Sequence, residues 1–123
     1  MALPYLSEVS ASTGLVLLDI CRYHQIMLNT ITHGTPTDLP PLLIAHGLYG
    51  SARNWNVIAK RMSETRTVIA PDMRNHSNSF WADSHSYMDM AGDLSEVIGA
   101  HGGQVDLVGH SMGGKAAMVL ALT

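Results

Sequence analysis

The feature that most constrains this fold is a glycine-rich turn that follows a short apolar run. Residues 104–108 read Gln-Val-Asp-Leu-Val and lead directly into Gly109-His110-Ser111-Met112-Gly113. A serine flanked by glycines, with a strand before it and a helical pattern after it, predicts a very tight strand-to-helix turn. Such a turn places the serine hydroxyl on its crest, above the N-terminus of the next helix. We therefore predict a nucleophile elbow with Ser111 as the catalytic nucleophile.

The segments before this turn alternate between strand and helix patterns. Short apolar runs at 42–45, 67–70 and 104–108 are typical of parallel strands that are covered on both faces. Helical spacing predicts a first helix with the apolar face Trp55, Ile58, Ala59 and Met62. A second helix presents Tyr87, Met90, Ala91, Leu94, Val97 and Ile98 and stops at Gly102-Gly103, and a third opens at Met112. This alternation favours an α/β fold, a mostly parallel sheet with helices on both faces.

The N-terminal part has a different pattern. Segments 15–20 and 25–32 predict an antiparallel pair of strands, whereas residues 1–13 lack periodicity and are interpreted as a flexible arm. Residues 14–123 are then interpreted as one partial α/β domain, because 123 residues suit a single small domain.

Composition excludes several classes of function. Apolar residues make up 46% of the chain and charged residues 14%, which favours a packed core over disorder. A net charge of −3 gives no electrostatic surface for nucleic acid. No apolar run approaches the roughly 20 residues of a membrane span, and the N-terminus lacks a signal-peptide pattern. The single Cys21 cannot form an internal disulfide. We expect a cytoplasmic protein without a membrane span or a nucleic-acid partner.

Three turns follow the three parallel strands, at residues 46–51, 72–79 and 109–113. Ligands of parallel sheets bind beyond the carboxyl ends of the strands, so these turns are expected to converge on one site. The backbone N–H of Met112 would point at the oxyanion of a tetrahedral intermediate, supported by the helix dipole. The Leu48 N–H, in the turn after the first parallel strand, is the expected second oxyanion donor.

Other residues of these turns are predicted to support the site. At Gly109, Gly113 and Gly114, a β-carbon would collide with the strand or the turn. His46 and Gly47 belong to the expected oxyanion turn, and Asp72 is a supporting residue of the next turn. Residues 74–76 (Arg-Asn-His) are expected to shape the pocket wall through loop hydrogen bonds, with a catalytic role as the alternative. Trp55 and Trp81 are interpreted as core or rim residues. Lys115 is interpreted as a surface residue, because Ser-x-x-x-Lys lacks the spacing of a Ser-Lys dyad.

A metal site is the alternative for the histidines at these turns. His46, His76 and His110 are separated by 30 and 34 residues, which matches no ligand spacing, so we expect neither a metal nor another cofactor. His110 adjoins the serine, but its side chain is expected to point away, which makes it a poor general base.

Together these motifs resemble the α/β-hydrolase superfamily. The segments Pro-Pro-Leu-Leu-Ile-Ala-His46-Gly47, Asp72-Met-Arg-Asn-His76 and Gly109-His-Ser-Met-Gly-Gly-Lys are similar to those of its small serine esterases, over roughly residues 15–123. The resemblance implies hydrolysis of a small carboxylic ester or thioester through an acyl-enzyme at Ser111. These esterases usually carry glycine where Ser77 stands. A serine nucleophile counts against the dehalogenase and epoxide-hydrolase branches, which use aspartate.

The resemblance also implies a triad in the chain order serine, acid, histidine. No acidic residue and no histidine follows Ser111, and the sequence stops within a helical pattern. We therefore expect an incomplete chain that is inactive by itself, with strand 104–108 as a bare apolar edge prone to self-association. The alternatives are a non-catalytic binding module of the pseudoenzyme type, or a C–C hydrolase or perhydrolase that uses the same triad.

Overall fold

The computed structural model describes residues 27–123 of the chain. The arm predicted at residues 1–13 and the strand predicted at 15–20 lie outside the described residues. The first described strand, β1, spans Thr30–His33, so residues 30–32 of the strand predicted at 25–32 are confirmed, whereas residues 25 and 26 lie outside the described residues. Residues 27–29, which precede β1, are not in regular secondary structure.

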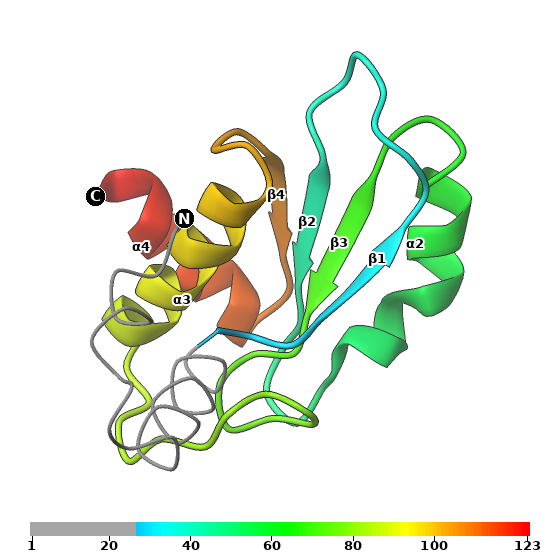
Figure 1. Ribbon diagram of the computed structural model, residues 1–123. Coiled ribbons are helices and arrows are strands. Elements are labelled where there is room, and N and C mark those ends of the chain that lie inside the picture. Colours follow the sequence, from blue (N-terminus) through cyan, green and yellow to red (C-terminus); the bar gives the residue numbers. More distant parts are fainter. Residues whose placement is uncertain (1–26) are drawn as a thin grey trace, which may run out of the picture.

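The structure contains a four-stranded mixed sheet, formed by β1, β2 (Leu42–Ala45), β3 (Val68–Pro71) and β4 (Asp106–Gly109). The strand order is β1-β3-β2-β4 (Figure 1). β2 pairs in parallel with β3 and with β4, whereas β1 runs antiparallel to β3, with Thr30 opposite Pro71. The predicted α/β class and the three parallel strands are confirmed. The antiparallel partner of β1 among the described residues is β3.

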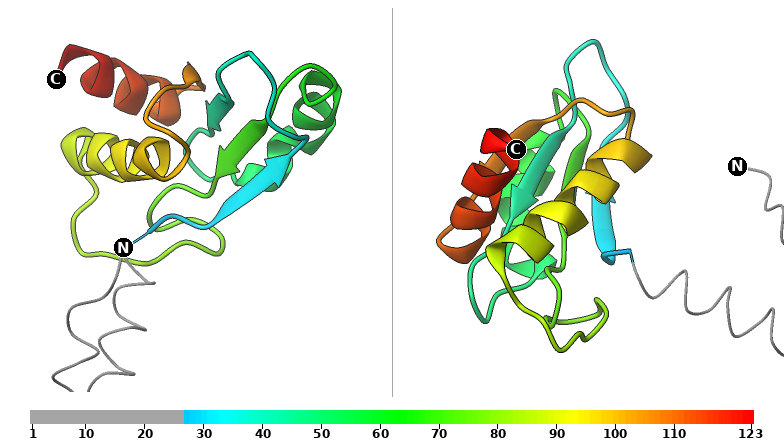
Figure 2. Two further views of the ribbon diagram at one scale, coloured as in Figure 1. Left: turned by 45° about the horizontal axis from the view of Figure 1, so that its top comes forward. Right: turned by 90° about the vertical axis from the view of Figure 1, so that its left-hand side faces the viewer.

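Helices cover both faces of this sheet (Figure 2). A 3-10 helix, η2 (Ala52–Trp55), runs into α2 (Asn56–Met62) on one face, and α3 (Tyr87–Ala100) and α4 (Met112–Leu122) lie together on the other. The start of α3 is capped, because the Ser86 hydroxyl accepts the Asp89 N–H at 3.0 Å. Its end is set by Gly102 and Gly103, whose φ angles are +97° and +83°.

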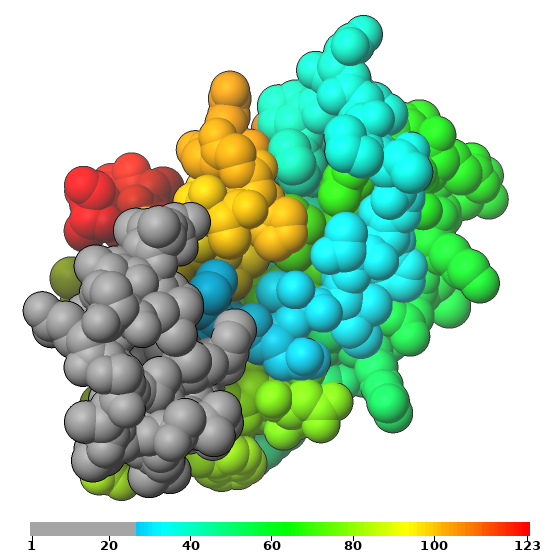
Figure 3. Space-filling model, in the orientation of Figure 1, coloured from blue at the N-terminus to red at the C-terminus, as the bar shows by residue number. Residues whose placement is uncertain are grey.

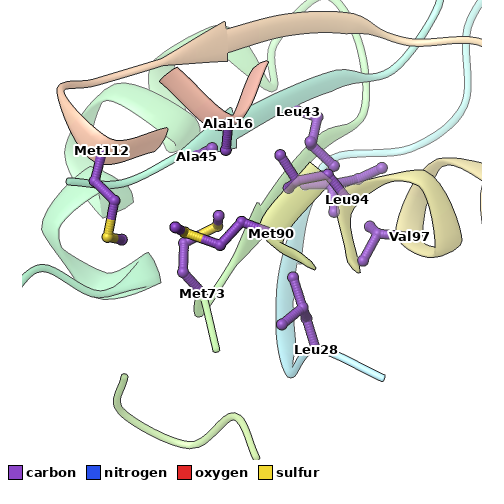
Figure 4. Packing of buried hydrophobic residues seen from close by; sticks show 10 residues of the cluster. Leu28, Leu43, Ala45, Met73, Met90, Leu94, Val97, Met112 and Ala116 are labelled. Atoms are coloured by element: carbon purple, nitrogen blue, oxygen red, sulfur yellow. The ribbon is translucent and has the colours of Figure 1, made fainter. Parts of the chain in front are cut away.

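The larger apolar core lies between the sheet and the two helices α3 and α4. Met90, Leu94 and Val97 of α3 are buried as the helical pattern predicted, whereas Tyr87 at the end of the same stripe is 39% exposed. Figure 4 shows Met73 and Met90 pointing toward one another within this cluster. Its other buried members are Leu28, Leu43, Ala45, Ile69, Met112 and Ala116. Leu28 packs in the same cluster as residues of α3. In the space-filling view, the blue start of the described chain lies beside the yellow atoms of α3 (Figure 3).

The predicted apolar face of α2 is wrong in part. Ala59 is buried and Trp55 is half-buried, but Ile58 is 50% and Met62 is 41% exposed. The pattern assumed one continuous α-helix, whereas residues 52–55 form a 3-10 helix with three residues per turn. This change of period shifts the phase of the helix, so that Ala59 is the one member of α2 that is buried against the sheet.

The strand that leads to the glycine-rich turn lies at an edge of the sheet. β4 pairs with β2 on one side and with no other strand among residues 27–123 on the other. Val108 is 45% exposed there, and Leu107 is half-buried. This is the apolar edge expected from the sequence, and self-association through it stays a prediction. No helix in the described part is long and apolar enough to cross a membrane.

Candidate active site

Ser111 occupies the crest of the turn between β4 and α4. It is the N-cap residue of α4, and its backbone has φ +51° and ψ −113°. A positive φ is sparsely populated by residues other than glycine, so this conformation is strained and must be held by the surrounding structure. The side chain is exposed, and none of the described residues forms a hydrogen bond with its hydroxyl.

Glycines allow the start of α4 to approach the sheet closely. A β-carbon on Gly109 would lie 2.5 Å from the Gly113 carbonyl oxygen, and one on Gly113 would overlap the Ala45 carbonyl oxygen. At Gly114 the approach is looser, because its β-carbon would lie 3.1 Å from the Gly109 oxygen. The contacts at Gly109 and Gly113 involve backbone atoms that cannot rotate away. The strained serine is therefore fixed by the close approach of β2, β4 and α4.

The turn after β2 lies directly against this serine. The His110 N–H donates to the Ala45 carbonyl at 2.9 Å, which joins the two turns. A β-carbon on Gly47 would lie 2.8 Å from His110 Nδ1 and 3.3 Å from the β-carbon of Ser111. Neither the Leu48 N–H nor the Met112 N–H donates to an acceptor within residues 27–123. The two backbone donors named from the sequence are thus free, on the two turns that the structure brings together.

His46 is buried beneath the first of these turns. Its Nε2 accepts the Met73 N–H at 2.9 Å, and its Nδ1 donates to the Gly47 carbonyl at 2.8 Å. Burial lowers the pKa of His46, against a smaller opposing effect of the Gly47 hydrogen bond. The neutral ring therefore joins β2 to the loop after β3. Both of its nitrogens are occupied, which leaves His46 no free atom for proton transfer to a substrate.

Asp72 directly follows β3, and its carboxylate binds backbone and side-chain N–H groups of the surrounding segments. It accepts the Asn29 side-chain N–H at 2.9 Å, the Ala52 N–H at 2.8 Å and the Asn78 N–H at 3.3 Å. These donors come from the segment before β1, from η2 and from the loop after β3. Because Asp72 is only 2% exposed, these hydrogen bonds replace its lost hydration. Asp72 therefore joins three segments around the candidate site through its carboxylate.

Asn75 and His76, in the loop after β3, form hydrogen bonds within this loop and to the turn after β2. Asn75 has φ +62°, and its side-chain oxygen accepts the Ala82 N–H at 2.6 Å. The buried His76 accepts the Tyr49 N–H through Nε2 at 3.1 Å and donates from Nδ1 to the Arg74 carbonyl at 2.8 Å. His76 therefore reaches the turn after β2, where Leu48 lies. Ser77 adopts φ +46°, a region of backbone conformation that favours glycine.

Sequence reasoning missed the main partner of Arg74. Its guanidinium forms a two-point ion pair with Asp93 of α3, with nitrogen–oxygen distances of 2.6 and 2.9 Å. Both groups are buried, and the Asp93 hydrogen bond is the main cause that raises the pKa of Arg74. A signal was present in the sequence, because Asp93 adjoins Leu94 on the buried stripe of α3. An acid at such a position requires a cation.

The remaining candidates lie at the margin of the site. His110 is exposed, and its ring lies 6.1 Å from that of Trp55. The Lys115 ammonium lies 5.7 Å from the Tyr87 ring and forms no ion pair among the described residues. Trp81 is 76% exposed. Within residues 27–123, no three His, Cys, Asp or Glu side chains gather in a way that could hold a metal ion.

A cavity of about 410 Å³ opens beside the turn after β2. It is lined by residues of that turn, by Asn54, Trp55 and Ile58 on η2 and α2, and by His110. The Ser111 side chain is not among the lining residues. A second hollow of about 470 Å³ lies farther along α2, on residues 57–64, away from the serine. The cavity beside the turn is therefore the one that adjoins the candidate site.

Comparison with known proteins supports one family. The model for the "Alpha/beta hydrolase family" matches residues 42–123. The chain is 43% identical over 89 residues to the sn-1-specific diacylglycerol lipase ABHD11 of Danio rerio, covering 70% of this chain and 28% of the lipase. It is 41% identical over 83 residues to the esterase YbfF of Escherichia coli, covering 65% and 32% of the two chains.

The same similarity extends to solved structures. A marine microorganism esterase superimposes with a TM-score of 0.72 at 43% identity, covering 77% of this chain and 36% of that one. The chain thus spans about a third of the length of the proteins that it matches.

Proposed function

This chain belongs to the alpha/beta hydrolase family, and from that premise we propose that Ser111 is the nucleophile of a serine hydrolase. The proposed substrates are small carboxylic esters or thioesters. Relatives named as esterases and lipases support hydrolysis in general. The reaction would begin with attack of the Ser111 oxygen on the substrate carbonyl, which forms a tetrahedral intermediate and then an acyl-enzyme.

The observation that carries this proposal is the strained backbone of Ser111. A non-glycine residue at φ +51° persists only where its surroundings impose that conformation, and such residues cluster at functional sites. Here the strain leaves the serine exposed at the start of α4. Glycine adopts a positive φ without steric strain, so we infer that serine occupies this position because of its hydroxyl group.

The free N–H groups of Leu48 and Met112 supply the second part of the proposal. Both lie beside Ser111, on backbone held by buried contacts at Gly47 and Gly113. Two such donors stabilise the negative oxygen of a tetrahedral intermediate, and loss of one typically costs about 3 kcal/mol of the barrier. The N-terminus of α4 adds favourable electrostatics at the same point.

Activation of the serine requires a histidine base and an acid, and the chain order of the family places both of them after the serine. His46 and His76 have both ring nitrogens engaged, and no acid or histidine follows Ser111 in the sequence. Without a triad base, catalysis falls to the residual contribution of the oxyanion donors. We therefore propose that the 123 residues alone do not turn over esters.

The same observation favours a second candidate, a non-catalytic binding module of this fold. The two candidates differ in whether Ser111 reacts when a base is supplied. C–C bond hydrolysis and perhydrolysis would use the same serine, and the described residues contain no group that separates them from ester hydrolysis. They are outcomes of the same experiment, run with different substrates.

A chimeric enzyme tests the proposal. Residues 28–123 would be joined to the C-terminal part of the Escherichia coli esterase, which is 41% identical over the shared region. Hydrolysis of p-nitrophenyl esters by the chimera is expected, with kcat reduced at least about a thousandfold by Ser111→Ala. A folded chimera that is inactive, or whose activity survives Ser111→Ala, would contradict the proposal. Ser77→Ala provides the matched control.

A further inference from the structure

Two buried histidines from different parts of the chain hold the turn that carries the Leu48 N–H. His46 Nδ1 and the Gly50 N–H both donate to the Gly47 carbonyl, at 2.8 and 2.9 Å. His76, from the loop after β3, accepts the Tyr49 N–H at 3.1 Å. Because a trans peptide directs its C=O and N–H in opposite directions, fixing the Gly47 oxygen also fixes the direction of the Leu48 N–H.

The hydrogen bonds require both rings to be neutral. A backbone N–H can only donate, so the Nε2 atoms that accept from Met73 and Tyr49 carry no proton. The proton of each ring is then on Nδ1, where it is donated to a carbonyl oxygen, of Gly47 for His46 and of Arg74 for His76. A second proton on His76 would place an N–H against the N–H of Tyr49, and that hydrogen bond would be lost.

The turn depends on this clamp because its own backbone is strained. Tyr49 has φ +62°, and its side chain is 91% exposed, so side-chain packing does not fix it. Among the described residues, His76 is the only hydrogen-bond partner of Tyr49. Loss of that bond would allow Tyr49 to relax and the adjoining Leu48 N–H to change direction.

We propose that His76 is a positioning residue that holds the Leu48 N–H in place through Tyr49, and that protonation of His76 releases this turn. The inference rests on the proposed role of Leu48 in the oxyanion hole and adds a group that controls it. Acid would then lower the stabilisation of the oxyanion without any change at Ser111 itself.

The charged and titratable groups around His76 give the new proton no compensating partner. His46 and His85 face its ring, at centroid distances of 5.1 and 5.8 Å. The guanidinium of Arg74 is turned toward Asp93 and Asp89, and the Asp72 carboxylate already accepts three N–H donors. The ring of His110 lies against Gly47, where a β-carbon would be 2.8 Å from His110 Nδ1. Burial lowers the pKa of the neighbouring His46, which favours the neutral form of that ring.

Hydrogen–deuterium exchange of the 123-residue chain, resolved to the Tyr49 amide by mass spectrometry, tests this inference. The protection factor, corrected for intrinsic exchange, is compared between pH 7.5 and pH 5, the range in which histidines titrate. We expect it to fall by about tenfold in the wild type, as the loss of one hydrogen bond implies. Amides of β2 serve as the internal control for an intact sheet.

Two variants separate positioning from a merely structural role. In His76→Gln the amide oxygen takes the place of Nε2 and does not titrate, so Tyr49 should stay protected at both pH values. In His76→Asn the side chain can still donate to the Arg74 carbonyl but cannot reach Tyr49, so protection should be low at both. If the β2 amides of a variant are not protected from exchange, that variant is not folded. The inference is then tested by the pH dependence of Tyr49 protection in the wild type.

Wild-type protection of Tyr49 that is unchanged between the two pH values would overturn the inference, as would the same loss in His76→Gln. The measurement involves no reaction at Ser111. Failure of the proposed hydrolase activity would therefore leave the exchange result intact, and failure of the exchange result would leave Ser111 as the proposed nucleophile. Ser111→Ala should give the wild-type profile.

Discussion

The loop after β3 and the turn after β4 both begin at the carboxyl ends of the parallel strands, yet different kinds of contact hold them in place. In the loop, buried side chains form the structure, because Asp72, Arg74 and His76 each bind several partners. In the turn, backbone contacts at Gly109 and Gly113 fix the chain, and the Ser111 hydroxyl is left exposed and without a partner. One region supports the site, and the other presents a reactive group.

The comparison separates two roles: hydrogen-bonded side chains support the site, whereas a strained backbone exposes the reactive group. The buried polar side chains of the loop, Asp72, Arg74 and His76, are engaged in hydrogen bonds and support the turn after β2. In the turn after β4, the backbone of Ser111 has an unfavourable conformation, and this conformation exposes the serine hydroxyl. The following substitutions test each side of this comparison.

The largest effect is expected at the buried ion pair of the loop. Asp93→Ala leaves the Arg74 guanidinium buried without its two-point partner, and we expect a loss of about 3–5 kcal/mol in the free energy of unfolding. Chemical denaturation measures this loss. Asp89→Ala is the matched control, because Asp89 contacts the same arginine at 3.5 Å from a more exposed position and should cost far less. Equal losses would show that the buried pair does not anchor the loop.

The turn should respond instead to backbone contacts. Gly113→Ala places a methyl group against the Ala45 carbonyl, and we expect a loss of about 3 kcal/mol because no flexible side chain can move away. Gly99→Ala is the control, since nothing lies within 4 Å of a β-carbon there. It should gain up to about 1 kcal/mol from helix propensity. A tolerated alanine at position 113 would contradict the close approach of α4 to β2.

Replacement of the strained serine should increase stability. Ser111→Gly relieves φ +51° and ψ −113°, and we expect a gain of about 1–3 kcal/mol in the free energy of unfolding. Thermal unfolding compared with Ser111→Ala, which keeps the strain, isolates the backbone effect. If both variants have the stability of the wild type, the conformation at Ser111 is not strained.

The pH dependence of stability should report the buried His46. Its pKa is lowered in the folded state mainly by burial, so the unfolded chain binds a proton more readily. The contribution of His46 is complete above about pH 6.5, the ordinary histidine value, and is lost as the pH falls toward the folded-state pKa. Unfolding at pH 7.5 and pH 5.5 in the wild type and in His46→Gln measures this difference. A slope that is unchanged in His46→Gln would assign the pH dependence to other groups.

The smallest effect is expected at Ser77, in the otherwise well-satisfied loop. Ser77→Gly removes the cost of φ +46°, and we expect a gain of up to about 1 kcal/mol in the free energy of unfolding. Asn78→Gly, at a neighbouring residue without a positive φ, is the control and should not be stabilising. A loss of stability in Ser77→Gly would mean that the serine side chain contributes more than its backbone costs.

Local patterns in the sequence predicted most of the fold. The strands β2, β3 and β4 and the helices α3 and α4 follow from short apolar runs and helical spacing, with boundaries that differ by one or two residues. The face of α2 was predicted incorrectly because the switch from a 3-10 to an α-helix at Asn56 has no clear signal in the apolar pattern.

The site was predictable to the extent that it depends on adjacent residues. The turn at Ser111 and its glycines follow from local sterics, whereas the Arg74–Asp93 pair joins residues 19 positions apart on a loop and a helix. The contact between His76 and Tyr49 spans 27 positions in the sequence. It requires the turn after β2 and the loop after β3 to meet at the carboxyl ends of the strands. Such pairs depend on tertiary structure, which hydrophobic periodicity does not specify.

We propose that this chain presents Ser111 as a nucleophile, and that residues 27–123 do not supply its triad base. Mass-spectrometric mapping of fluorophosphonate labelling tests it most directly, with the 123-residue chain and the chimera treated in parallel. We predict a label on Ser111 in the chimera, formed at least about a hundredfold faster than in the 123-residue chain, because only an activated serine reacts readily. Labelling of the chimera at a different residue, or equal rates at Ser111 in the two proteins, would contradict this account.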